Sequence, residues 1–178
     1  MNLYITSGTL EFLQAILSKN NKERMILIHN RTTSLLLHET SQKSLFKFPR
    51  KYEVIDGAEE LLQEGLIIMN NIPVSEEGRP TFEHMSKKSL EILRMQPGIK
   101  AIRILRPIKS ETYIILTQWK DEIAFKAWQN NTSYQSAFNY EGVTSSSQKL
   151  FTGNAFITQY SAPKLNDNFW KWFGNSKV

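Results

Sequence analysis

Apolar side chains in the second half of the chain recur with two different periods. The runs over residues 66–74, 99–105, 113–119 and 155–160 are short and rich in branched or aromatic side chains, which predicts four strands. Phe82, Met85, Leu90 and Leu93 fall on one face at about 100° per residue, which predicts an amphipathic helix after the first of these strands. A second helix is predicted over residues 122–128, and it resumes after a pause at residues 130–132.

The first 63 residues show a shorter version of the same pattern. We expect a strand over residues 3–5, then a helix capped by Thr9. Strands over residues 25–29 and 34–38 follow. A third short strand is predicted over residues 45–48, ended by Pro49, and residues 52–55 form either a further strand or a bent connection.

The order strand, helix, strand, strand, helix, strand predicts an α+β fold, a ferredoxin-like antiparallel sheet with two helices on one face. Its open face requires a partner sheet, supplied either by a second subunit in a homodimer or by the smaller amino-terminal α/β unit of the same chain. We favour the second arrangement, an internal pseudo-dimer that forms a sandwich or barrel. The expected divisions are residues 1–63, residues 64–163 and an aromatic tail over residues 164–178.

Composition and charge limit the kinds of site and partner that the chain can have. The chain contains no cysteine, which excludes disulfides, thiolate nucleophiles and Cys-ligated metal sites. The net charge of +5 is scattered, its densest group being Lys43, Lys47, Arg50 and Lys51, so an ordinary solvated surface is expected and no nucleic-acid partner. The chain shows neither a signal-peptide pattern nor a long apolar run, so we expect a cytoplasmic protein.

Several spacings together resemble a known family. Asn71 lies seven residues before Gly78, and after a helix come a Pro97-Gly98 break, two strands and Trp128. This order resembles the antibiotic biosynthesis monooxygenase superfamily, in particular its Bacillus-type heme-degrading monooxygenases and the staphylococcal target of RNAIII-activating protein. The resemblance covers nearly the whole chain, including residues 3–9, 38–40, 52–56 and 103–107.

The resemblance implies a heme site, with heme as both cofactor and substrate. Asn71 and Trp128 match the catalytic asparagine and tryptophan of the family, and Met85 is a candidate for contacting the porphyrin. The iron-binding histidine of the family falls on Phe138, which has no lone pair and is not a metal ligand. Tyr134 and Tyr140 are alternative ligands or pack at the pocket rim.

Two functions therefore remain open. The first is a heme-degrading monooxygenase-like protein, impaired by Phe138, which takes up heme or another flat hydrophobic molecule and needs an unknown electron donor. The second is a non-catalytic binding, stress-response or signalling relative. Without the resemblance, Trp128 is an ordinary core residue and Asn71 an ordinary turn residue.

Overall fold

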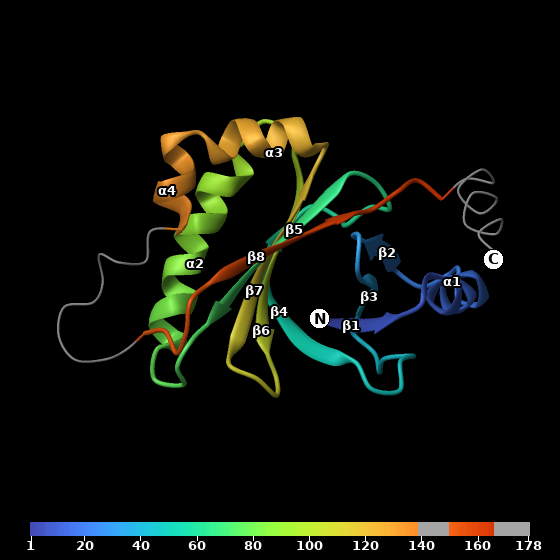
Figure 1. Ribbon diagram of the computed structural model, residues 1–178. Helices are drawn as coiled ribbons and strands as arrows, with labels where there is room; N and C mark the ends of the chain where they lie inside the picture. The colour runs from blue at the N-terminus through green and yellow to red at the C-terminus, as the bar shows by residue number, and fades with distance from the viewer. Residues whose placement is uncertain (139–149, 166–178) are drawn as a thin grey trace.

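The structure, a computed structural model, describes residues 1–138 and 150–165 of the 178-residue chain. The described strands are β1 (Asn2–Gly8), β2 (Met25–His29), β3 (Ser34–Thr40), β4 (Arg50–Ala58), β5 (Leu66–Pro73), β6 (Ile99–Pro107), β7 (Thr112–Trp119) and β8 (Phe156–Ser161). The described helices are α1 (Leu10–Lys19), α2 (Arg79–Arg94), α3 (Glu122–Gln129) and α4 (Thr132–Phe138). The strands pair antiparallel and close into one barrel in the order β1-β3-β2-β8-β5-β7-β6-β4 (Figure 1).

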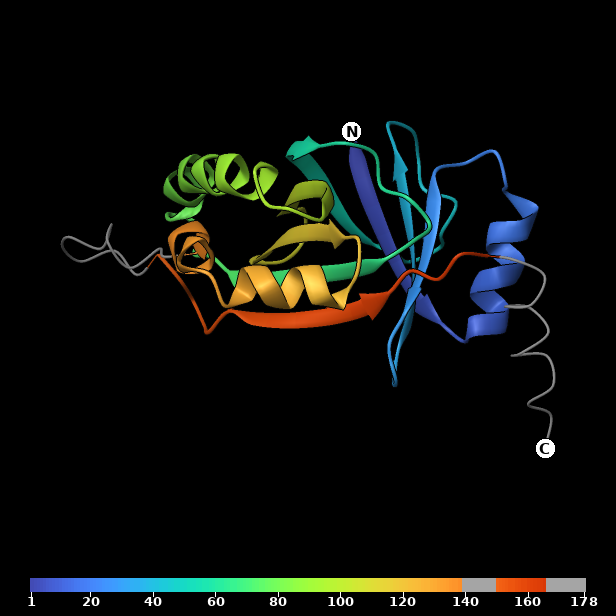
Figure 2. The same ribbon diagram turned by 90° about the horizontal axis from the view of Figure 1, so that it is seen from above.

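The two halves of the barrel have the same topology. In each half the strands lie in the order fourth, first, third, second, namely β4-β1-β3-β2 and β8-β5-β7-β6. A helix follows the first strand of each half, α1 or α2. Between the third and fourth strands the second half has α3 and α4, whereas the first half has only the loop over residues 41–49. The predicted ferredoxin-like fold is confirmed, and α1 lies at one end of the molecule with α2, α3 and α4 at the other (Figure 2).

The barrel closes because the second strand of each half pairs with the fourth strand of the other. β4 pairs with β6 from Tyr52↔Pro107 to Ala58↔Ile102, and β2 meets β8 at His29↔Ser161. Closure removes the unpaired sheet edges that otherwise invite association with other chains. The internal pseudo-dimer expected from the sequence is therefore the arrangement adopted, as a barrel.

Most predicted elements are confirmed within a few residues, but the strand over residues 45–48 is wrong. These residues form part of the loop between β3 and β4. Phe46 turns inward, 8% exposed, and its ring lies 5.8 Å from that of His38, so the run of apolar residues reflects one anchor rather than a strand. Residues 166–178, most of the predicted aromatic tail, lie outside the described residues.

Three apolar clusters fill the fold. One is the barrel interior, which includes Leu37, Ile67, Met69, Ile114 and Leu116. The second lies between α2, α3, α4 and the outer face of β5, β6 and β7, and we call it the helix-side cluster. It contains Leu66, Ile68, Ile72, Val74, Phe82, Leu90, Leu93, Ile102, Ile104, Tyr113, Ile115, Trp119, Phe125, Trp128, Ala137 and Leu150. The third packs α1 onto the first half of the barrel.

A buried ion pair joins the two halves inside one end of the barrel. Arg103 of β6 donates to both carboxylate oxygens of Glu39 on β3, at 2.5 and 3.0 Å. Its remaining guanidinium nitrogen donates to the carbonyls of Ala58 and Glu59. Both charged groups are almost fully buried, so each depends on the other for its solvation.

The turn into β5 depends on a glycine. Gly65 has φ of +76°, and a Cβ there would lie 2.2 Å from the carbonyl oxygen of Trp119. We expect Gly65→Ala to lower the free energy of unfolding by about 2 kcal/mol or more, through backbone strain and this collision. Urea denaturation measures this change in the free energy of unfolding. Gly153→Ala is the matched control, because its nearest neighbour is Pro73 at 3.6 Å, and equal losses in the two variants would contradict the assignment.

Candidate functional site

The structure places Asn71 inside the barrel. Side chains alternate along β5, and Ile67 and Met69, which share the face of Asn71, belong to the barrel interior. The cross-strand partner of Asn71 is Ile114, which also faces the barrel. The Asn71 amide donates to the carbonyls of Met69 and Phe156 at 3.0 and 3.3 Å and to Thr158 Oγ1 at 3.3 Å. The Asn71 amide nitrogen therefore already donates to other groups of the chain.

Asn70, the preceding residue, occupies the opposite face of β5. It shares that face with Ile68 and Ile72, and its partner on β7 is Ile115, all members of the helix-side cluster. The side chain of Asn70 is 7% exposed and has no hydrogen-bond partner among the described residues. Asn70 is not among the described residues whose buried polar atoms lack a partner, which are Gln14, His38 and Arg79. Beside it on β8 lies Ile157, which is 41% exposed.

Trp128 of α3 lies on the helix side, within an aromatic group. Its ring stacks on that of Trp119 with centroids 5.0 Å apart, and the Tyr134 ring meets it edge-on, also at 5.0 Å. Its indole nitrogen donates to Ser133 Oγ at 3.1 Å, and its exposure is 4%. The sheet thus separates Trp128 from the side chain of Asn71, although the resemblance assigns both residues to one heme site. Asn70 is the asparagine on the side of Trp128.

The other predicted site residues fall on the helix side where they are described. Met85 and Tyr134 are partly buried against the helix-side cluster. Phe138 is the last residue of α4, but its side chain lies outside the described residues, as does Tyr140. Ser89 of α2 donates to the carbonyl of Ala137 at 2.5 Å and so fixes α4 next to α2.

None of the three histidines takes the place of the missing iron ligand. His29 and His38 lie on β2 and β3 in the first half of the barrel, and His84 is exposed on α2. Among the described residues no group of three or more His, Asp or Glu side chains is arranged to hold a metal ion.

A charged cluster fixes α2 over the sheet. Arg106 of β6 donates to both oxygens of Glu83, at 2.7 and 2.5 Å, and to Glu53 at 2.9 Å, while the Tyr113 hydroxyl donates to Glu83 at 2.6 Å. The hydrogen bonds from Arg106 lower the pKa of Glu83, and burial followed by the nearby Glu83 raises the pKa of Tyr113. Glu83 is therefore an ionised structural anchor rather than a proton donor.

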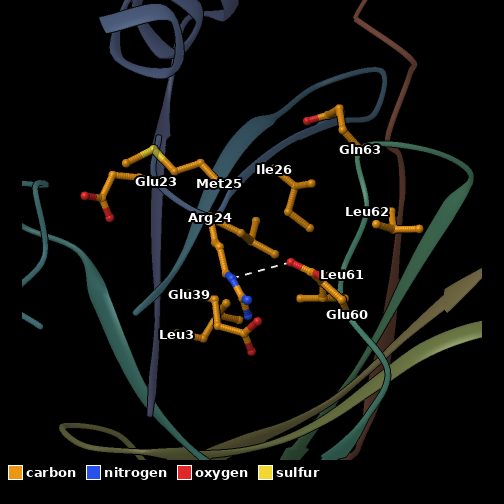
Figure 3. Close-up of a pocket in the computed structure, with 11 residues that line it drawn as sticks. Leu3, Glu23, Arg24, Met25, Ile26, Glu39, Glu60, Leu61, Leu62 and Gln63 are labelled. Carbon is orange, nitrogen blue, oxygen red and sulfur yellow. Dashed lines mark ion pairs between the residues drawn. The ribbon is translucent and has the colours of Figure 1, made fainter. Parts of the chain in front are cut away.

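Two hollows border these elements from outside. One, of about 400 Å³, lies along α3 and is lined by Trp128, Pro97, Lys120, Ile123 and Asn131 among others, but not by Asn70, Met85 or Tyr134. The other, of about 250 Å³, lies at the barrel end near the Arg103–Glu39 pair (Figure 3). Its carboxylates are paired, Glu23 with His38, Glu39 with Arg103, and Glu60 with Arg24 at 3.4 Å.

Residues 65–140 match the antibiotic biosynthesis monooxygenase (ABM) family. This stretch of the chain is similar to the ABM family. The match begins at β5 and extends past α4, so it contains Asn70, Met85, Trp128 and Phe138, and the predicted resemblance is confirmed. None of the helices in the described residues has the length and hydropathy that a membrane crossing requires.

Individual relatives are similar to this chain over most of its length, beyond residues 65–140. The signal transduction protein TRAP of Staphylococcus epidermidis is 26% identical over 147 residues, 81% of this chain and 86% of the relative. The heme-degrading monooxygenase of Listeria monocytogenes is 23% identical over 155 residues, 79% of this chain and 92% of the relative. A solved structure of a major regulator of staphylococcal pathogenesis has the same fold, with a TM-score of 0.81 at 24% identity over 92% of this chain and 100% of that one.

The donor set of the ABM domain does not fit a His-ligated heme iron. Phenylalanine stands at position 138, and the described histidines lie elsewhere. The helix side itself is a packed apolar and aromatic cluster, bordered from outside by the hollow along α3.

The Glu83 cluster predicts how stability depends on pH. Because the folded-state pKa of Glu83 is below its ordinary 4.5, its contribution is complete above pH 4.5 and is lost as the pH falls through the lower folded value. We expect Glu83→Gln to cost about 1 kcal/mol of unfolding free energy at pH 7, discounted for partial exposure, and less at pH 3.

Urea titrations at the two pH values test this expectation. Glu91→Gln is the control, because Glu91 is 71% exposed and pairs only with Arg94 one turn away. We expect its cost to stay below about 0.5 kcal/mol. A Glu83→Gln penalty that is unchanged or larger at pH 3 would contradict the pKa shift.

Proposed function

We propose that this protein is a non-catalytic binding relative of the heme-degrading monooxygenases. It holds a flat apolar ligand, with heme as the first candidate, against the helix side of its ABM sheet. The observation that carries the proposal is the position of Asn70, a polar residue on the same side of the sheet as Trp128, with Ile68, Ile72 and Ile115 of the helix-side cluster around it.

The surroundings of Asn70 support binding. Its amide offers donors and an acceptor, and the adjacent Ile157 leaves two-fifths of its surface exposed on the same face. Met85 and Tyr134 are partly buried in the same helix-side cluster. One orienting polar group within an apolar and aromatic surface is the usual composition of a small-molecule site.

The identity of residue 138 supports the loss of catalysis. Ten residues after Trp128, at the end of α4, the chain has Phe138, whose side chain has no lone pair for iron. Tyr134, one of the two alternative ligands, packs its ring against Trp128 with centroids 5.0 Å apart. That one relative is named a signal transduction protein and another a heme-degrading monooxygenase agrees with a fold that serves more than one function.

The first test restores the missing ligand. We expect wild-type protein titrated with hemin to show weak binding and no bleaching with ascorbate. Phe138→His should bind roughly tenfold tighter or more, with a sharp Soret band, since even residues that only support a metal ligand are worth that factor. Stoichiometric binding and bleaching by the wild type would contradict the loss of catalysis. A folded Phe138→His variant that binds no better would contradict a retained porphyrin site.

The second test uses the two neighbouring asparagines. In the Phe138→His background, Asn70→Ala should weaken hemin binding several-fold while leaving urea stability within about 0.5 kcal/mol, because its amide loses no hydrogen bond to another described residue. Asn71→Ala is the matched control and should do the reverse, costing stability through the lost hydrogen bonds inside the barrel and sparing binding. The opposite pattern would place the ligand on the barrel side.

A further inference from the structure

The first half of the molecule has a basic surface that the ABM site does not use. It surrounds the loop between β3 and β4 and continues onto the adjacent turn between β6 and β7, where Ile108 N donates to the carbonyl of Lys51 at 3.2 Å. We call it the basic loop surface. Its exposed members are Lys43, Leu45, Lys47, Phe48, Arg50, Lys51, Ile108 and Lys109.

This surface is held in place by the fold. Phe46 is buried beneath α1, and the backbone amide of Phe46 binds Ser44 Oγ at 3.0 Å. The Tyr4 hydroxyl of β1 donates to the carbonyl of Gln42 at 3.2 Å. Because Phe46 anchors the loop inward, the flanking Leu45 and Phe48 project outward.

Large apolar side chains alternate with cations on it. Phe48 is 93% exposed, Leu45 52% and Ile108 46%. A hollow of about 460 Å³ beside them is lined by Arg50, Lys51 and Lys109 among others. Five of the chain's 22 cationic side chains gather here, and Glu111 is an exposed carboxylate next to the turn. Exposed apolar side chains that gather in one patch with a polar rim are typical of an interaction surface.

We propose that the basic loop surface docks on an anionic lipid membrane. Phe48, Leu45 and Ile108 enter the boundary between headgroups and acyl chains, and the lysines and arginine face the anionic headgroups. Charge complementarity selects an anionic partner, and the aliphatic Leu45 and Ile108 select lipid over nucleic acid, because bases stack on aromatic rings and gain little from aliphatic side chains. The turn between β6 and β7 adjoins the start of α2, where Arg79 donates to the carbonyl of Ser110 at 3.2 Å, whereas α3 and α4 lie farther from this surface (Figure 1).

Vesicle co-sedimentation tests the proposal. Full-length protein should bind vesicles of phosphatidylcholine with 30% phosphatidylserine, about the proportion that gives a strongly negative surface. It should bind neutral phosphatidylcholine vesicles far more weakly, and high salt should release it. Lys47→Gln should lower the partition coefficient about fivefold, the equivalent of one cation near such a surface. Phe48→Ser should lower it about tenfold.

Two control variants test whether the loss of vesicle binding is specific to the basic loop surface or follows from any lost charge or any lost apolar side chain. Lys88→Gln on α2 removes the same charge, and Ile123→Ser removes an apolar side chain that is 80% exposed on α3, so both should leave partitioning unchanged. Equal binding to neutral and anionic vesicles, or equal losses in the controls, would overturn the proposal. Tighter binding to a single-stranded oligonucleotide or to an acidic polypeptide, insensitive to Phe48→Ser, would overturn it in favour of that partner.

Discussion

Successive side chains along β5 point to opposite faces of the sheet, and this alternation decides which residues can line the proposed site. β5 lies between β7 and β8 with both faces buried, so each residue belongs either to the barrel interior or to the helix-side cluster. Asn70 and Asn71 are neighbours in sequence but are separated by the thickness of the sheet. Asn71 satisfies its amide inside the barrel, whereas Asn70 lies on the side of Trp128 and makes no hydrogen bond to another described residue. The ligand-binding proposal follows from this difference.

The two halves of the barrel differ in what lies between their third and fourth strands. The strand order of both halves is the same, and the fourth strand of each half pairs with the second strand of the other. Only the second half, however, has helices between its third and fourth strands. In the first half that place is taken by the loop anchored by Phe46, which fills the space beneath α1 and turns its other side chains to solvent. The first half therefore acts as an internal partner sheet, and its loop is available for another role.

The sequence predicts the fold well because its strands and helices differ clearly in period and are bounded by Gly and Pro. It predicts the site less well for a physical reason. Residues 66–72 form an uninterrupted buried run, since both faces of β5 are covered, and such a run carries no alternation from which to read a face. Spacing from Gly78 selects Asn71, but only the pairing of Asn70 with Ile115 shows which amide faces the helices. The stacking of Trp128 on Trp119 is likewise a tertiary contact without a local signature.

The central claim is that Asn70, and not Asn71, faces the ligand. The most direct measurement follows the side-chain amide resonances of ¹⁵N-labelled Phe138→His protein while gallium protoporphyrin IX, a diamagnetic analogue of heme, is added. The account predicts that the Asn70 side-chain signals shift in proportion to bound porphyrin while those of Asn71 stay in place. Shifts confined to Asn71, or absent from both at saturation, would contradict it.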